Sequence, residues 1–328
     1  MSIKPGALRF NTDSMKLEMF RGESTAGQWE EIQATSPEAQ TGGARGLFAG
    51  GYAGAASAPK TTSNIDYVNI ASTGNAVSFG SLSFGADQDM VPVGASRTRG
   101  VFRKGSATTM EYVTFASTGN SVSFGTALTS NNRANGLSNE TRGIYGGGND
   151  AASKVNIDYI TIASTGNAVD FGTMTGTLSP GTGASSTRGI FAGCAAHPAT
   201  GGNIIEFITI ATLGNAADFG DLSAGGNTYQ TNSSSNSTRM FVLDDFAIDK
   251  IQIQTLGNAV DFGDTSSSTS PGGGCASPTR ALFGAGNDPA VKIEYINIAT
   301  EGNAVDFGDL TYIENRHGCG MSNAHGGL

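Results

Sequence analysis

The stretch "STGNAVSFG" at residues 72–80 recurs five more times along the chain with few changes. The later copies are "STGNSVSFG" (117–125), "STGNAVDFG" (164–172), "TLGNAADFG" (212–220), "TLGNAVDFG" (255–263) and "TEGNAVDFG" (300–308). Successive Phe-Gly pairs are 45, 47, 48, 43 and 45 residues apart. A period of this size marks a repeat architecture, and it is typical of propeller blades rather than helical solenoids.

One unit, residues 140–174, shows how such a repeat divides into strands. "ETRGIYGGG" (140–148) predicts an apolar strand that ends in glycines, and "VNIDYITIAS" (155–164) alternates as a strand does. We interpret "TGN" as a tight hairpin turn, because Gly166 and Asn167 both tolerate positive φ. "AVDFG" (168–172) is then the returning strand, and the Ser/Gly/Asn-rich stretch before the next "TRG" supplies a fourth, weaker strand. Each unit therefore predicts four short antiparallel strands.

The composition agrees with an all-β fold. The 328 residues include 48 Gly, about twice the average usage, and only 14% are charged. The C-terminal "RHGCGMSNAHGGL" (316–328) parallels "RANGLSNETRGIY" (133–145), so we expect residues 311–328 to complete the blade that begins near residue 40. A ring closed by both termini has no free sheet edge there. The prediction is a six-bladed propeller over residues 35–328, preceded by a separate segment, 1–34.

Two charged positions repeat in all six units. An Arg opens the apolar strand and an acid begins the next one. The arginines are Arg45, Arg99, Arg142, Arg188, Arg239 and Arg280, and the acids are Asp66, Glu111, Asp158, Glu206, Asp249 and Glu294. One reading is a ring of charges around a pore or ligand. The reading that we favour is one partly buried Arg–carboxylate pair per blade that fixes strand register, because these positions follow the symmetry of the scaffold.

The unit resembles kelch-type propeller blades. "GLFAGG" (46–51) and "GIYGGG" (143–148) look like the kelch strand that ends in two glycines, and Tyr67, Tyr112, Tyr159 and Tyr295 look like its aromatic on the next strand. Kelch blades place a Trp shortly after that Tyr, whereas here Phe79 and its equivalents stand twelve residues away. The resemblance therefore implies a kelch-like propeller rather than a true kelch repeat.

A second resemblance lies in "GALRFNTDSMKLEMFRGESTAGQWEEI" (6–32). It is similar to a short segment common in tail fibres and virion structural proteins of tailed bacteriophages. The sequence of the repeat of about 45 residues also looks like repeats in phages of marine bacteria, including cyanophages. The segment predicts a hairpin in which "ALRF" and "KLEMF" flank the turn "NTDS". Such a hairpin is marginal alone, so we expect it to attach to another chain through Phe10, Leu17, Phe20 and Trp29.

Several kinds of chemistry lack a signal in the sequence. The net charge is −9, so nucleic acid is not an expected partner. Cys194, Cys275 and Cys319 have no disulfide or metal spacing, and we expect small buried hydrophobic residues there. We expect no metal site at the three histidines or at the acidic stretch 242–250, and no cofactor. No nucleophile elbow, P-loop, dinucleotide fingerprint or sialidase box occurs, no apolar membrane span is present, and the N-terminus lacks a secretory core.

The expected function is therefore a non-enzymatic structural or interaction protein of a virion, made in the host cytoplasm. It would be a tail fibre, fibre tip or decoration protein that displays a propeller for host-surface recognition. Its partners would be other virion chains, within a homo-oligomer or larger assembly, and a host glycan or protein. The alternative is a lectin that binds sugar through loops 53–64, 193–203 and 286–291, since recognition residues concentrate on loops that vary over a constant scaffold. A propeller enzyme is the third and least favoured reading.

Overall fold

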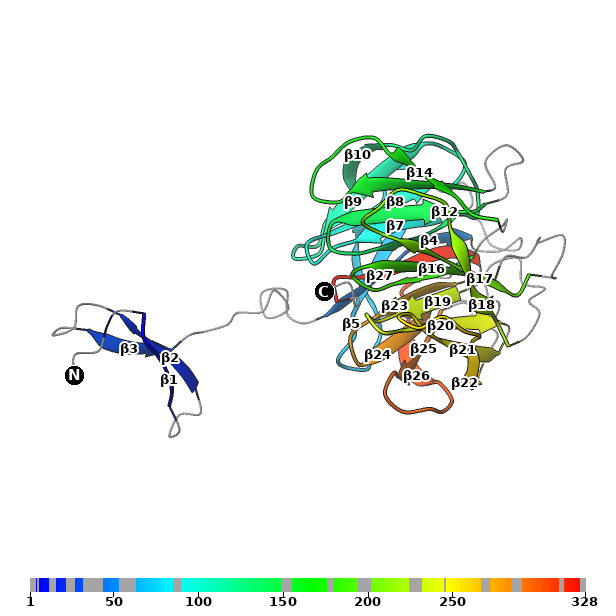
Figure 1. Cartoon of the computed structure of the whole chain (residues 1–328). Helices are drawn as coiled ribbons and strands as arrows, with labels where there is room; N and C mark the ends of the chain where they lie inside the picture. The colour runs from blue at the N-terminus through cyan, green and yellow to red at the C-terminus, as the bar shows by residue number, and fades with distance from the viewer. Residues whose placement is uncertain are drawn as a thin grey trace. The chain divides into compact units, whose positions relative to one another are not determined.

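The chain divides into two compact units, Met1–Gln40 and Thr41–Leu328. The structure is a computed structural model, and it describes residues 4, 6–11, 16–21, 27–31, 44–52, 63–84, 90–148, 155–175, 180–193, 202–223, 232–244, 246–266, 272–284, 291–312 and 316–324. Every helix or strand within these ranges is a β-strand, so the all-β prediction is confirmed for them (Figure 1).

The first unit is a small antiparallel sheet in the order β1 (Leu8–Asn11), β2 (Lys16–Arg21) and β3 (Gln28–Glu31). The sequence predicts the hairpin of β1 and β2 but not β3. "QWEE" (28–31) contains no β-branched residue and two acids, so it lacks the usual composition of a strand. The third strand brings Trp29 directly opposite Phe20.

The second unit contains six four-stranded antiparallel sheets among its described residues, which we number in chain order. The first is β27 (Arg316–Ser322), β4 (Arg45–Tyr52), β5 (Asn64–Asn69) and β6 (Val77–Ser81). The second is β7 (Met90–Ala95), β8 (Arg99–Lys104), β9 (Thr109–Thr114) and β10 (Val122–Thr126), and the third is β11 (Asn135–Ser138), β12 (Arg142–Gly146), β13 (Asn156–Thr161) and β14 (Val169–Thr173). The fourth is β15 (Gly181–Ala184), β16 (Arg188–Ala192), β17 (Ile204–Thr209) and β18 (Ala217–Asp221). The fifth is β19 (Asn232–Ser235), β20 (Arg239–Asp244), β21 (Ala247–Gln252) and β22 (Val260–Asp264), and the sixth is β23 (Gly273–Ala276), β24 (Arg280–Gly284), β25 (Lys292–Asn297) and β26 (Val305–Asp309).

These sheets pack face to face in chain order, as a β-propeller-like repeat does. The first-listed strand of each sheet contacts that of the next sheet, and β23 contacts β27. Six clusters of buried apolar side chains lie between consecutive sheets, one for each pair. The pair formed by the sixth and first sheets has its own cluster, in which Phe307 packs with Phe48 and Val68. The core is therefore divided among the sheet interfaces.

Both ends of the second unit contribute to the first sheet. Strand β27, drawn in red in Figure 1, pairs with the blue β4 in antiparallel register, with Ser322 opposite Gly46. The turn that joins the first two strands of the third sheet is fixed by Asn139, whose Oδ1 accepts the Arg142 amide at 2.8 Å. In the first sheet Asn323 accepts the Arg45 amide at the same 2.8 Å, although the two residues lie at opposite ends of this unit. Two distant segments thus build the turn that one segment builds elsewhere.

The repeated TGN segment fastens each sheet to the one before it. Gly166 donates its amide to Phe124 O at 2.9 Å, and Asn167 Oδ1 accepts the Thr126 amide at 3.1 Å. Equivalent amide–carbonyl contacts, at 2.8 to 3.2 Å, join every consecutive pair of sheets. They include the contact from Gly74 to Phe307, which joins the first sheet to the sixth. The outer edge of each Phe-Gly strand is thereby covered, which removes an unpaired edge that would otherwise favour aggregation.

The interpretation of TGN as a tight hairpin turn is therefore wrong, although its glycine does have a positive φ, between 146° and 159°, in every sheet except the third. Asn167 has no positive φ, and its side chain spans two sheets rather than closing its own hairpin. The glycine of Phe-Gly forms the other side of this contact, because the TGN backbone of the next sheet lies against it. A Cβ on Gly125 would stand 2.5 Å from the carbonyl carbon of Gly166, closer than packed atoms approach. The nine repeated residues thus supply both halves of one contact between neighbouring sheets.

Candidate functional site

The six repeated arginines bind the backbone of the next sheet rather than the expected carboxylates. Arg142 of the third sheet donates to Ile210 O of the fourth at 2.6 Å, and its guanidinium stacks over the Tyr159 ring at 4.9 Å. The same pattern runs from Arg45 to Phe115, and Arg280 of the sixth sheet reaches Ala71 O of the first at 3.0 Å. Arg99, Arg188 and Arg239 donate to Ala163, Ile253 and Ile298 respectively. A local sequence pattern does not reveal whether an arginine donates to a carboxylate or to a backbone carbonyl of an adjacent sheet. The predicted Arg–carboxylate pairing is therefore wrong.

The repeated acids have a different set of partners. Five of the six carboxylates accept a hydroxyl and a backbone amide from a Ser or Thr that follows the Phe-Gly strand of the preceding sheet. Glu206, for example, accepts Thr175 Oγ1 at 2.7 Å and the Thr175 amide at 3.0 Å. The other pairs are Asp66 with Thr311, Glu111 with Ser83, Asp249 with Ser223 and Glu294 with Ser266. These acids therefore join each sheet to the preceding one.

Burial and bonding shift the pKa of individual acids in opposite directions. Burial raises the pKa of Asp66 above its usual value, although the hydrogen bonds from Thr311 oppose the rise. Burial alone would raise the pKa of Glu294 as well. Hydrogen bonds from Ser266 and the ammonium group of Lys292, 3.1 Å away, outweigh burial and hold this pKa below its usual value. These arrangements keep a buried carboxylate supplied with donors, as its stability requires.

Asp158 is the exception among the six acids. The position that carries Ser or Thr in the other units is Leu128 here, so no side-chain hydroxyl reaches this carboxylate from the strand end. Tyr145, where four of the other units have Phe and one has Val, instead places its hydroxyl near both Asp158 and the Leu128 amide. Burial, with the Asp170 charge, raises the pKa of Asp158 to about 6 although Tyr145 opposes the rise. Burial and the same carboxylate raise the pKa of Tyr145 above its usual value.

Arg103 completes this asymmetric cluster. It is fully buried, whereas the other units place Ala, Gly or Leu at the same strand position. Its guanidinium donates to Thr129 O at 3.3 Å and Asn131 O at 2.6 Å, and it lies over the Tyr145 ring at 5.2 Å. Asn131 in turn bonds the backbone of Gly105 and Gly147. The cluster therefore holds the connection 127–134 between the second and third sheets.

Arg103, Tyr145 and Leu128 belong to none of the sites predicted from the sequence. The signal that identifies them is departure from the repeat, which appears only when the six units are aligned position by position. Asp158 is 4% exposed and Arg103 0%, so a substrate in solution does not reach either group in this structure. Chemically, the cluster is a buried, proton-binding joint between two sheets.

The first-listed strands surround a cavity of about 90 Å³. Its lining is dominated by Gly, Ser, Ala and Asn from β7, β11, β15, β19, β23 and β27. Ser138 Oγ bonds both the amide and the carbonyl of Ala95 at 2.9 Å, so a side chain joins strands that make no ladder with each other. Small residues are required because the strands approach closely: a Cβ on Gly273 would stand 2.5 Å from the backbone of Cys319.

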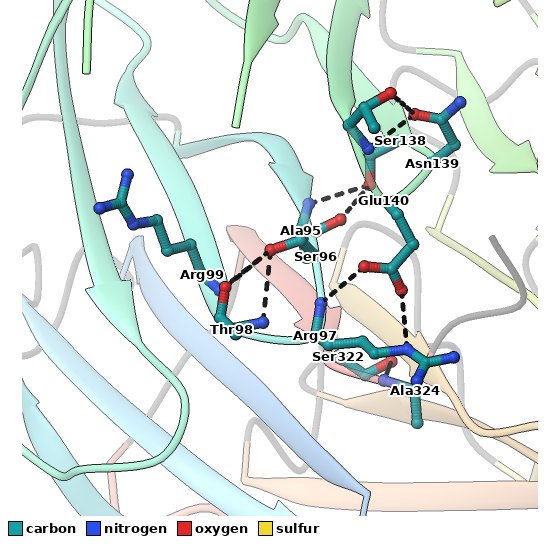
Figure 2. A network of polar contacts seen from close by, with 11 residues as sticks. Ala95, Ser96, Arg97, Thr98, Arg99, Ser138, Asn139, Glu140, Ser322 and Ala324 are labelled. Atoms are coloured by element: carbon teal, nitrogen blue, oxygen red, sulfur yellow. Dashed lines mark hydrogen bonds and ion pairs between the residues drawn. The ribbon is translucent and has the colours of Figure 1, made fainter. Parts of the chain in front are cut away.

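Polar contacts continue at one end of these strands, at the turns that lead into the arginine strands. Figure 2 shows Arg97, in the turn of the second sheet, reaching Glu140 in the turn of the third. Arg97 Nε and Glu140 Oε1 are 3.2 Å apart and both side chains are about one-third exposed, so this ion pair stabilises the joint only weakly. Figure 2 also shows Ser96 and Asn139 accepting backbone amides within their turns.

The attachment residues lie in the first unit. Phe20 is 6% exposed, and its ring meets that of Trp29 edge to face at 5.4 Å, while the Arg9 guanidinium lies over Trp29 at 4.3 Å. The Phe20 ring lies against Gly27, where a Cβ would collide with it. The apolar face that carries Phe20 is therefore partly covered by residues of its own sheet. The strand positions of Phe10 and Leu17 face each other in β1 and β2, but their side chains lie outside the described residues.

Other candidate groups are placed as follows. Cys275 and Cys319 are buried free thiols, while Cys194 and the greater part of the three candidate sugar-binding loops lie outside the described ranges. Within those ranges no three His, Cys, Asp or Glu side chains gather as a metal site would require. The described part of the chain also contains no helix of the length and hydropathy that crossing a membrane requires.

Comparisons with known proteins do not assign the chain to a family. No protein-family model matches it, and a search of curated proteins found no match.

Proposed function

We propose that the six four-stranded sheets are the blades of a closed six-bladed β-propeller and that the protein is a non-enzymatic structural and interaction protein. The closure is supported by three kinds of contact between the sixth and first sheets. These are the packing of β23 against β27, the TGN contact from Gly74 to Phe307 and the arginine contact from Arg280 to Ala71. Each repeats a contact made between the other sheets.

The use of the repeated charged residues carries the proposal. In an enzyme, perturbed acids and arginines converge on an accessible pocket. Here the six arginines and five of the six acids are bonded to neighbouring sheets in a regular order. The central cavity of about 90 Å³ is also well below the roughly 300–1,000 Å³ of small-molecule sites. A rigid scaffold accounts for these residues without a substrate.

The attachment role is proposed for the first unit. It forms a compact sheet of its own, separate from the propeller-like unit, and Leu8 in it is 60% exposed. A sheet of three short strands has little core, so contact with another chain would stabilise it. The resemblance of residues 6–32 to a tailed-phage segment supplies the kind of assembly: a virion, in which the chain would be a tail-fibre or decoration component that displays its propeller to the host surface.

Mass spectrometry of purified phage particles tests the virion assignment. The proposal expects this chain in particles that sediment with the packaged genome, in a fixed ratio to the other structural proteins. Its presence only in the soluble fraction of infected cells would contradict the assignment. A glycan array then distinguishes a sugar-binding propeller from a protein-binding one, because only the former binds defined saccharides.

A further inference from the structure

The joint between the second and third sheets differs chemically from the other five. In the others a hydroxyl and an amide from one sheet satisfy a carboxylate of the next. At this joint Leu128 supplies no hydroxyl, and the carboxylate of Asp158 is buried beside groups from three strands. These groups are Arg103 of β8, Tyr145 of β12 and Asp170 of β14. An ionised carboxylate is costly in such a place unless donors surround it.

We propose that Asp158 makes this joint a pH-responsive fastening, which tightens when its carboxyl binds a proton and loosens when it ionises. Asp170 disfavours the ionised form by repulsion, whereas the Arg103 guanidinium favours it. Because Arg103 also holds the carbonyls of Thr129 and Asn131, the state of Asp158 is transmitted to the connection 127–134. At the other five joints a Ser or Thr hydroxyl donates to the carboxylate, an arrangement that this joint lacks.

The direction of the pH effect follows from proton linkage. The pKa of Asp158 is raised to about 6 in the folded protein, against 3.8 for the free side chain. The stabilisation is therefore fully present below about pH 4 and is lost as the pH rises through about 6. An opening that exposes Asp158 to water becomes more frequent by up to about a hundredfold over this range, because each pKa unit of difference is a factor of ten.

Amide hydrogen exchange on the full chain measures this opening directly. The Asn131 amide, which bonds Gly105 O, reports on the connection. The Leu222 amide, which bonds Asn203 O after the Phe-Gly strand of the fourth sheet, is the control at a joint where Ser223 donates its hydroxyl to Asp249. Protection factors, corrected for the intrinsic pH dependence of exchange, should fall between pH 4 and 8 at Asn131 and stay level at Leu222.

Two variants separate this proposal from a general effect of pH. Asp158→Asn removes the titration and should make protection at Asn131 independent of pH. Leu128→Ser restores the hydroxyl of the other units and should move the midpoint to lower pH, whereas Leu128→Ala, which removes the bulk without adding a hydroxyl, should not. The proposal is overturned if Asn131 and Leu222 respond alike to pH, or if Asp158→Asn retains the wild-type pH dependence. It is also overturned if Leu128→Ala moves the midpoint as far as Leu128→Ser.

Discussion

Replacing Gly125 by Ala tests the contact that explains the nine-residue repeat. The added Cβ would lie 2.5 Å from the carbonyl carbon of Gly166 and closer still to its oxygen. Both are backbone atoms, so no side-chain rotation relieves the overlap. Gly125 has no left-handed φ, which means that the effect comes from the collision alone.

The expected loss of stability can be worked from the contacts that the collision displaces. Forcing one extra methyl group into a packed site costs about 1–3 kcal/mol. Moving the TGN segment away also weakens three hydrogen bonds, from Gly166 to Phe124 O, from Ala168 to Thr126 O and from Thr126 to Asn167 Oδ1. Each hydrogen bond contributes about 1 kcal/mol, and water replaces part of this loss. Together with the cost of the added methyl group, the expected loss of stability is about 3–5 kcal/mol.

Urea unfolding followed by far-UV circular dichroism measures this loss. Tryptophan fluorescence is unsuitable, because the only Trp, Trp29, lies in the N-terminal unit. Gly166→Ala is the matched control on the other side of the contact: a Cβ there meets nothing within 4 Å, so its stability should stay within about 1 kcal/mol of the wild type. Unfolding of Gly125→Ala at the wild-type urea concentration, or an equal loss of stability in both variants, would contradict this role of Gly125.

Three further outcomes follow from the same contacts. Arg142→Ala should cost about 2–3 kcal/mol, since it removes a charged donor to Ile210 O and a cation–π contact; wild-type stability in Arg142→Lys would show that charge alone matters and would contradict the role of the guanidinium. Thr175→Val should cost about 1.5–3 kcal/mol by removing the hydroxyl that Glu206 accepts, and thermal unfolding unchanged from the wild type would contradict this role. Deleting residues 1–40 should leave a monomer with wild-type thermal unfolding that no longer joins particles; assembly of the shortened chain, seen by sedimentation, would refute the attachment proposal.

The sequence predicts the strands of this protein better than the contacts between its sheets. The strand around Tyr159 was predicted because β-branched and aromatic residues alternate there, and the returning strand at Phe171 because the repeat makes it recognisable. The strand "GTGA" (181–184) is hard to recognise, because close approach of neighbouring strands selects small residues over residues that favour strands.

Contacts between sheets were mispredicted because their partners are distant in sequence. Gly166 bonds Phe124 and Arg142 bonds Ile210, so the segment around either residue does not reveal its partner. Local reasoning supplied a nearby alternative in each case, a hairpin turn for TGN and a carboxylate for the arginine. The asymmetric cluster was missed for another reason. Arg103 stands out only against the Ala, Gly or Leu of the other units, so a motif defined by the residues that repeat does not contain it.

A crystal structure of the full chain would show whether the repeated residues fasten six sheets into one closed ring. We expect a hydrogen bond from the Gly74 amide to Phe307 O, the contact that joins the first and sixth sheets. We also expect β27 paired with β4 within the same molecule. A ring with a different number of sheets, or an open arrangement in which Gly74 and Phe307 lie apart, would contradict the closed ring of six sheets.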